Sequence, residues 1–288
     1  MKGRYKSAPL SYMTARMVVA KLPPLLQDQA ILLAQKMKFL GFIYHESHSG
    51  KKIVFNVKDE NKFSSEDISR TCFLKSDRKV AILFDDHGIE YRTTNYTQFS
   101  DFCDVFQKVV NECMKIDVYQ SLKIEEVILS YVDTIIPFKS YKLGDFFANG
   151  EDFLPLKYFD KESSLLSFSK TSLNKVLKSN HRVEIHFEEL PQKANSYIPN
   201  DLAEGVTSFK MPIDIPIKMD ENSDEHYILL TTMGYELHEE EIVREDNGVI
   251  SGKSVEELFS LSHRTCRKEF NALINKEVCD EAWGYTED

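Results

Sequence analysis

The run of residues 124–137, IEEVILSYVDTIIP, constrains the fold more than any other segment of the chain. Its β-branched and apolar residues favour a strand. Pro137 ends the run, because proline lacks the amide hydrogen that a strand must donate. Few residues inside the run are charged, which is typical of a strand covered on both faces. We therefore expect a strand here, in the middle of a sheet.

Strand and helix patterns alternate on either side of this run. We expect helices over residues 25–40 and from Thr97 onward, and a last helix that begins at Ser254 with the capping box Ser254-x-x-Glu257. We expect polar loops at residues 220–225 and 239–248. Further strands are expected at Pro9–Leu22, Lys52–Val57, Arg70–Lys75, Lys79–Phe84, Gly88–Thr93, Ser164–Ser169, Arg182–Leu190, Ser208–Lys218 and Tyr227–Leu237.

These patterns predict an α+β fold. We expect two sheet-and-helix halves, residues 1–138 and 139–288, that pack as one unit, with mostly antiparallel strands and long helices packed on the sheets. No run reaches the roughly 18 apolar residues that a membrane helix needs. Five scattered cysteines without a CxxC spacing suit a reducing compartment, so we expect a cytoplasmic protein without membrane contact.

Charge is divided along the chain. The net charge is −10, yet residues 1–80 carry a net +8 and the remainder a net −18. Basic residues interleaved with aromatic ones suit single-stranded nucleic acid, through phosphate contact and base stacking. The candidate set is Arg16, Lys51, Lys52, Lys58 and Lys62. The alternative is that the aromatic residues form strand cores and that the two charged regions are solvated or neutralise each other.

The chain lacks the common catalytic motifs, with no GxGxxG, GxxxxGK[ST], GxSxG or HExxH. Strand alternation does place Glu184, His186 and Glu188 on one face of the strand at residues 182–190. Carboxylate and imidazole ligands suit manganese, iron or zinc, which makes a metal-dependent hydrolase one hypothesis. The same alternation is typical of any half-buried strand with a wet polar face. No catalytic residue and no cofactor is assigned.

Other polar groups have structural explanations. The sequence His45-Glu46-Ser47-His48 precedes a Ser-Gly pair and predicts an exposed loop, and Asp85-Asp86-His87-Gly88 predicts a hairpin turn. His263, Arg264, Arg267 and Lys268 are expected on the solvent face of the last helix, and Trp283 is expected to pack the tail. We expect these polar side chains to lie apart and not to meet in one cleft.

Several segments together resemble a family. Ala8-Pro9-Leu10, Tyr96-x-x-Phe99, the strand at residues 129–135, the strand at 228–232 and the late segment at 258–274 resemble a sporadically distributed, uncharacterised bacterial family. That family has a proline-led first strand, an "LRYxNxI" strand and an "LH…F…IT" ending. Ser130, Asp133 and Thr231 stand where its pattern has arginine, asparagine and an acid. The resemblance implies a cytoplasmic bacterial protein, with some relatives in accessory or phage-defence neighbourhoods.

Three functions follow as hypotheses. The first is a non-enzymatic interaction protein, an accessory or immunity-type subunit that contacts another protein subunit or forms a homo-oligomer, since catalytic motifs are missing and divided charge suits steered docking. The second is a nucleic-acid-binding defence component that uses the basic residues of the first third. The third is the metal-dependent hydrolase described above.

Overall fold

A computed structural model describes residues 4–55, 63–138, 140–149, 168–200, 202–203, 210–220, 223 and 225–286. Its strands are β1 (Arg4–Tyr5), β2 (Leu10–Val19), β3 (Phe42–Phe55), β4 (Phe63–Lys75), β5 (Val80–Asp85), β6 (Gly88–Thr93), β7 (Ser121–Ile135), β8 (Ser169–Lys178), β9 (His181–Pro191), β10 (His226–Arg244), β11 (Ile250–Ser251) and β12 (Tyr285–Thr286). The α-helices of these residues are α1 (Gln27–Phe39), α2 (Phe99–Cys113), α5 (Val255–Leu273) and α6 (Lys276–Trp283). None of these helices is both long and apolar enough to cross a bilayer.

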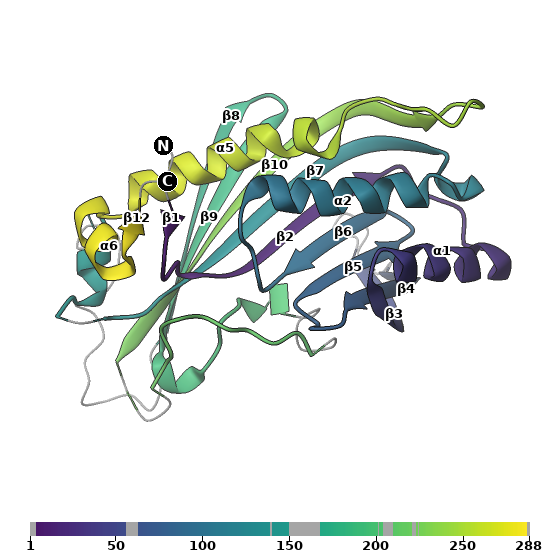
Figure 1. The fold of residues 1–288 in the computed structure, drawn as a ribbon. Helices are drawn as coiled ribbons and strands as arrows, with labels where there is room; N and C mark the ends of the chain where they lie inside the picture. Colours follow the sequence, from purple (N-terminus) through teal and green to yellow (C-terminus); the bar gives the residue numbers. More distant parts are fainter. Residues whose placement is uncertain are drawn as a thin grey trace.

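One ten-stranded antiparallel sheet organises the chain (Figure 1). Its order is β3-β4-β5-β6-β2-β7-β10-β9-β8, and β11 pairs with β10. The expected α+β class and the antiparallel pairing are confirmed. The sheet contains strands from both sides of residue 138, and the division into halves at residues 138 and 139 stays a prediction.

Strand β7 lies in the middle of this sheet, as the sequence indicates. It pairs with β2 along one edge and with β10 along the other. From Leu129 to Ile135 every residue is buried. The apolar run at residues 124–137 therefore forms a central strand because both of its faces are covered.

Helices α2 and α5 lie side by side on one face of the sheet (Figure 1). Their apolar stripes meet in aromatic contacts, with the Phe259 ring edge-on to Phe102 at 5.7 Å between centroids. Helix α1 joins the same core through Leu33 and Met37, both fully buried. This core holds most of the apolar side chains of β2, β6 and β7 that face the helices.

Helix α5 comes very close to the sheet at Gly234 of β10. A Cβ atom at this position would lie 2.9 Å from Cβ of Ser262 and 3.2 Å from Sγ of Cys266. Glycine is the residue that lets the helix backbone approach a strand so closely. The contact fixes the height of α5 above β7 and β10.

The opposite face of the sheet is covered by residues 197–200, 202–203 and 210–219. Ile198 and Met211 pack there against Tyr12 and Val132. The expected strand Ser208–Lys218 is wrong for its described part, since residues 210–218 form no strand. Proline occupies positions 212 and 216, and neither can donate a ladder hydrogen bond.

Three further expectations on strands and loops are corrected. Strand β10 continues to Arg244, so the loop expected at residues 239–248 is wrong up to that point. A register shift between Leu237 and Glu240 lets the acidic half of β10 go on pairing with β7. The loop expected at His45–His48 is part of β3. Of the strand expected at Ser164–Ser169, residues 164–167 lie outside the described residues, and β8 begins at Ser169.

The first and last described strands pair with each other. Strand β1 runs antiparallel to β12, and Trp283, the last residue of α6, is 1% exposed. Its ring packs edge-on against Tyr5 at 5.3 Å and stacks on Phe146 at 5.6 Å. Packing of the tail by Trp283 is thus confirmed.

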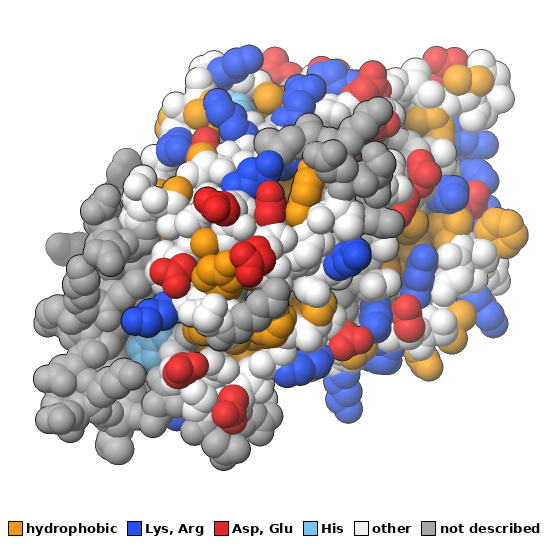
Figure 2. All heavy atoms as spheres, turned by 60° about the vertical axis from the view of Figure 1, so that its left-hand side comes forward, with side chains coloured by type: hydrophobic (Ala, Val, Ile, Leu, Met, Phe, Trp, Pro, Cys, Tyr) orange, Lys and Arg blue, Asp and Glu red, His pale blue; other side chains and the backbone are white. Residues whose placement is uncertain are grey.

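Charges of opposite sign from distant parts of the chain meet on the surface. Lys36 lies 3.2 Å from Glu112, and Lys21 lies 3.6 Å from Asp86, which pairs basic residues of the first eighty with acids beyond them. Figure 2 shows basic and acidic side chains interspersed over the face that it displays. These contacts agree with mutual neutralisation of the two charged regions.

The capping box of α5 is confirmed and provides a stability test. The Glu257 amide donates to Oγ of Ser254 at 3.3 Å, and the Ser254 amide donates to Oε2 of Glu257 at 2.8 Å. We expect Ser254→Ala to lower the free energy of unfolding by about 1 kcal/mol, because the Glu257 amide loses its side-chain acceptor. Ser260→Ala is the matched control on the same helix, where Oγ bonds only the Glu256 carbonyl. Urea unfolding of both variants measures the difference, and equal effects would contradict the capping role.

Candidate functional site

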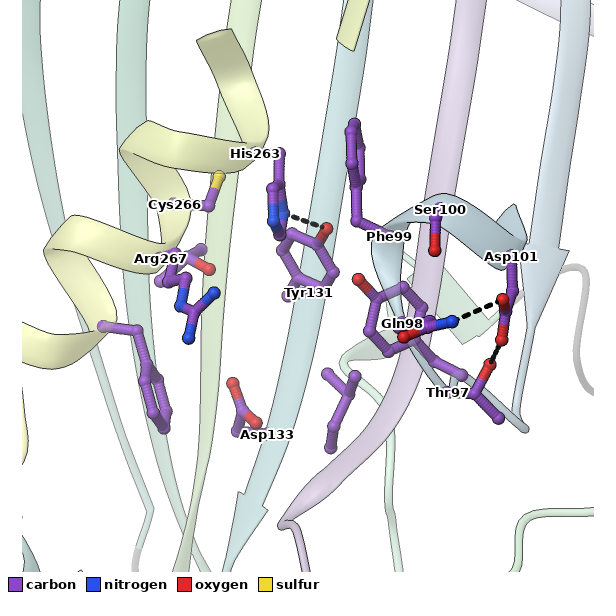
Figure 3. Close-up of a pocket in the computed structure, with 14 residues that line it drawn as sticks. Thr97, Gln98, Phe99, Ser100, Asp101, Tyr131, Asp133, His263, Cys266 and Arg267 are labelled. Carbon is purple, nitrogen blue, oxygen red and sulfur yellow. Dashed lines mark hydrogen bonds between the residues drawn. The ribbon is translucent and has the colours of Figure 1, made fainter. Parts of the chain in front are cut away.

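A pocket of about 670 Å³ lies where the start of α2, the end of β7 and the middle of α5 meet (Figure 3). Its lining comes from five parts of the fold that are far apart in the sequence. The lining residues are Leu10 of β2, Tyr96 to Asp101 around the start of α2, Tyr131 and Asp133 of β7, Thr232 of β10, and His263, Cys266, Arg267 and Phe270 of α5.

Strand alternation on β7 supplies two of the pocket's polar groups. Successive side chains of a strand point to opposite faces, so Tyr131 and Asp133 share the face that the helices cover. Leu129 on the same face is part of the core under α2 and α5. Beyond Leu129 this face of the strand carries the polar side chains of Tyr131 and Asp133, and the helices do not cover them completely. These two side chains form the floor of the pocket.

His263 and Tyr131 form a hydrogen-bonded pair on one wall. The Tyr131 hydroxyl lies 2.8 Å from Nδ1 of His263, and the His263 ring stacks on Phe99 at 4.1 Å with an interplanar angle of 4°. Burial, together with the nearby positive charges of Arg267 and Arg264, lowers the pKa of His263 to about 4. Burial raises the pKa of Tyr131. Near pH 7 a protonated Tyr131 hydroxyl and a neutral imidazole therefore share this hydrogen bond.

The positions of these α5 residues correct one expectation. His263 was expected on the solvent face of the last helix, but it lies against Phe99 and lines the pocket. Arg267 is exposed and also borders the pocket, while Arg264 and Lys268 are exposed as expected. The prediction is wrong because it treats α5 alone and places its polar face in solvent. The start of α2 packs against part of that face.

Asp133 is the most unusual group of the pocket. Its side chain belongs to a residue only 6% exposed, and it has no hydrogen-bond or ion-pair partner among the described residues. Burial raises the pKa of this carboxyl from 3.8 to about 7. A buried carboxylate without a partner is costly, because its charge has lost water without gaining a donor. The free carboxyl faces the pocket, where a ligand can supply the missing donor (Figure 3).

Positive potential comes from two other parts of the pocket. In Figure 3 the guanidinium of Arg267 borders the same space as the Asp133 carboxyl. The first turn of α2 adds the partial positive charge of a helix N-terminus. Its N-cap is Gln98, while Thr97 donates to Asp101 at 2.6 Å. Hydrogen bonds from Gln98 and Thr97 lower the pKa of Asp101, so this exposed carboxylate is already bound by its neighbours.

Cys266 lines the pocket without being an activated nucleophile. The residue is 1% exposed, and burial raises the pKa of its thiol to about 12. The thiolate is the reactive form of cysteine, and it is scarce at neutral pH when the pKa is this high. Cys266 therefore contributes apolar contact to the wall.

The three candidate metal ligands of β9 do lie on one face. Nε2 of His186 is 3.6 Å from Oε2 of Glu184, while Glu188 forms a 2.6 Å ion pair with Lys170. Nδ1 of His186 is 3.0 Å from the Ser172 hydroxyl. The described residues contain no group of three or more His, Cys, Asp or Glu side chains placed to hold a metal ion. The metal hypothesis stays a prediction, and all three of its residues are engaged by other side chains, since Glu184 lies 3.4 Å from Nε of Arg182.

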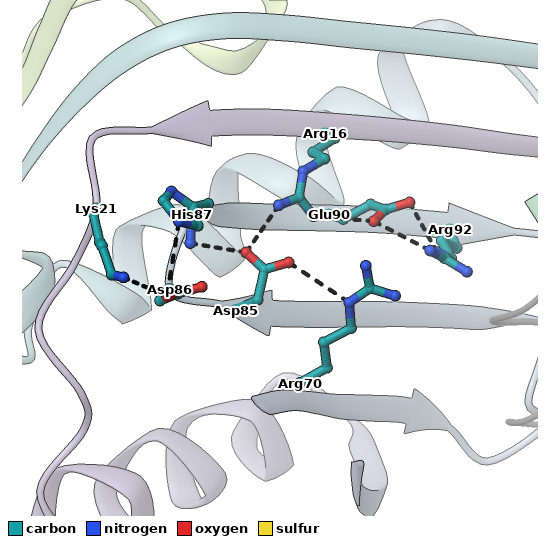
Figure 4. Close-up of polar contacts among 8 residues, drawn as sticks. All are labelled: Arg16, Lys21, Arg70, Asp85, Asp86, His87, Glu90 and Arg92. Carbon is teal, nitrogen blue, oxygen red and sulfur yellow. Dashed lines mark hydrogen bonds and ion pairs between the residues drawn. The ribbon is translucent and has the colours of Figure 1, made fainter. Parts of the chain in front are cut away.

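Arg16, a candidate for nucleic-acid contact, lies in a network of charges on the sheet face opposite the helices (Figure 4). It donates to Asp85 at 2.8 Å and to Glu90 at 3.4 Å. Glu90 also accepts from Nε of Arg92 at 2.8 Å, and Nε of Arg70 lies 3.8 Å from Asp85. The positive charge of Arg16 is thus balanced by neighbouring carboxylates.

The other basic candidates cannot be brought together with Arg16. Lys58 and Lys62 lie outside the described residues, and Lys51 and Lys52 belong to the stretch of β3 whose side chains are not described. Their role in nucleic-acid binding stays a prediction. Of the polar groups singled out above, His45, Asp85 and His186 lie on β3, β5 and β9 and do not share the pocket.

The chain matches no protein-family model, and no similar sequence is found among curated proteins. The family resemblance of the Tyr96-x-x-Phe99 and 129–135 segments stays a prediction. The argument for function therefore depends on the site itself.

The sequence did hold one signal for the pocket. Asp133 is a carboxylate inside a run that is otherwise apolar and β-branched at its end, residues 131–137. A charged residue in a central strand is costly unless it is paired or has a functional use. The other residues that line the pocket come mainly from the start of α2 and from α5, about thirty and one hundred and thirty residues away, so local patterns could not identify them.

Asp133→Asn should stabilise the protein, and more so as the pH rises. The folded pKa of about 7 lies above the ordinary value of 3.8, so the wild-type protein loses stability as pH rises from 4 to 7 while the variant does not. The difference approaches about 4 kcal/mol at pH 8, since each pKa unit corresponds to about 1.4 kcal/mol. Thermal unfolding of both proteins at pH 5 and pH 8 measures it. A difference that stays constant between these pH values would contradict a buried, unpaired carboxyl.

The cysteines should resist alkylation in the folded protein. Burial raises the pKa of Cys266 and of the other four thiols, and all five are free. We expect iodoacetamide at pH 8 to leave them unmodified over a time in which the urea-unfolded chain is fully labelled, as intact mass measures. Rapid modification of Cys266 in the folded protein would show an accessible, activated thiol.

Proposed function

We propose that the chain is a binding protein for a small organic molecule, which it holds in the pocket between α2, β7 and α5. The observation that carries this proposal is the Asp133 carboxyl, which is buried, without a partner and open to the pocket. A bound donor group would supply the hydrogen bond that the protein leaves unmade.

The size and lining of the pocket support this function. A volume of about 670 Å³ is within the range that holds small ligands. Aromatic rings of Tyr96, Phe99, Tyr131 and Phe270 supply apolar walls, and a few polar groups are placed among them. Such a combination of apolar walls and few convergent polar groups is typical of ligand sites.

Binding is favoured over chemistry by the protonation states of the pocket groups. His263 has a pKa of about 4 and is engaged with Tyr131, which makes it a weak base. Burial raises the pKa of Tyr131 and of Cys266, so neither is primed as a nucleophile. A non-enzymatic role agrees with the first hypothesis from sequence. Contact with a further subunit and nucleic-acid binding stay predictions.

A fragment screen by ligand-observed NMR tests the proposal. The library is screened against the wild-type protein and against Ser100→Trp, which places a large ring at the pocket-lining start of α2. The matched control is Ser260→Trp, the same change on α5 at a position that does not line the pocket. We expect fragments that bind the wild type and Ser260→Trp alike, and that bind Ser100→Trp at least tenfold more weakly.

Two results would contradict the proposal. One is a screen without any fragment that binds the wild-type protein. The other is a set of fragments that binds Ser100→Trp and the wild type equally, because such fragments occupy another part of the surface.

A further inference from the structure

We propose that the ligand is a small aromatic zwitterion, with a protonated nitrogen at Asp133 and an anionic group at Arg267. This inference rests on the function proposed above and names the chemical class of the ligand. It is carried by two opposite charges that line one aromatic-walled pocket, with Asp133 buried and Arg267 exposed.

Asp133 selects for a cation at the floor. The residue is 6% exposed, and its carboxyl has no partner among the described residues. A protonated amine or amidine offers charge and hydrogen-bond donors together, which makes it the strongest partner for a buried carboxylate. A neutral donor would leave the negative charge uncompensated away from water.

Arg267 selects for an anion at the rim. The residue is exposed on α5 and borders the pocket beside the start of α2. A guanidinium binds carboxylate and phosphate groups through paired N–H donors. The partial positive charge of the α2 N-terminus is offset by the Asp101 carboxylate in its first turn. The attraction for an anionic group at the rim therefore comes from Arg267.

The aromatic walls favour a ring between these two ends. Tyr96 lies edge-on to Tyr131 at 5.6 Å, and Phe99 is stacked on His263. Phe270 closes the α5 side of the pocket. Aromatic rings pack well against such walls, and a cation near their faces gains further attraction.

The charge of Asp133 links binding to pH. Its pKa is about 7 in the free protein, so the carboxylate form is a minority at pH 6 and a majority at pH 8. The other titratable groups around it have pKa values outside this window, since His263 is lowered to about 4, Asp101 is lowered, and Tyr96, Tyr131, Cys266 and Cys279 are raised. Arg267 keeps its positive charge throughout.

Four matched probes test the ligand class. They are 4-(aminomethyl)benzoate, benzylamine, benzoate and benzyl alcohol, which share one ring and differ in charge. Dissociation constants are measured by NMR titration at pH 8 with the full chain. We expect 4-(aminomethyl)benzoate to bind best, benzylamine several-fold more weakly, and the other two at least tenfold more weakly than the zwitterion. For benzylamine, affinity should rise about tenfold from pH 6 to pH 8, because only the carboxylate form of Asp133 binds the cation and its fraction rises by this factor.

Substitutions separate the two ends of the ligand. Asp133→Asn should abolish benzylamine binding, weaken the zwitterion at least tenfold and remove the pH dependence. Arg267→Gln should weaken the zwitterion several-fold and leave benzylamine unchanged or tighter. Lys268→Gln is the control for Arg267→Gln, since it removes a neighbouring exposed cation that does not line the pocket, and it should leave both affinities unchanged.

The outcomes distinguish the ligand class from the function itself. Equal binding of benzyl alcohol and benzylamine, preferential binding of benzoate, or no binding of any probe would overturn the zwitterion. The function proposed above would survive these results if the fragment screen finds neutral or anionic ligands that Ser100→Trp weakens. Loss of fragment binding in that screen would instead remove the pocket as a binding site, together with the ligand class that depends on it.

Discussion

Backbone hydrogen bonding of β7 on both of its edges is the constraint on which the rest of the structure depends. Strands β2 and β10 pair with it along most of its length, so it has no free edge, and its residues from Leu129 to Ile135 are all buried. Pairing fixes which side chains point to the helices, and a shift by one residue would exchange the two faces. Tyr131 and Asp133 face α2 and α5 for this reason, so the sheet fixes the positions of these two side chains in the pocket.

Burial of Asp133 lowers the free energy of unfolding, so the chain loses stability at this position. An asparagine or an apolar residue would suit the strand better, since neither carries a charge into a poorly hydrated site. Natural proteins keep such unfavourable groups mainly where they are used. The contrast with the sheet's other face is instructive, because Glu90 there is bonded by Arg92 and Arg16. One buried carboxylate is thus compensated by the protein, and the other has no partner among the described residues.

Local rules predicted the elements that local forces determine. The central strand, the Asp85–Gly88 hairpin and the capping box at Ser254 each depend on residues a few positions apart, and all three are confirmed. The acidic end of β10 was predicted to be a loop because glutamate has a weak preference for strands. It forms a strand because pairing with β7 outweighs that preference. The pocket joins α2, β7 and α5, and no pattern in one segment reports where another segment will pack.

Gly234 decides which parts of this pocket are open to change. Helix α5 contacts the backbone of Gly234 directly, so it cannot pack closer to the sheet. A larger residue at position 234 would move the helix away from the sheet. Side chains such as Leu10, Thr232 and Phe270 line the cavity without making that contact. Substitutions at these positions can change the shape of the pocket while α5 stays in place. The same fold can therefore accommodate pockets of different selectivity.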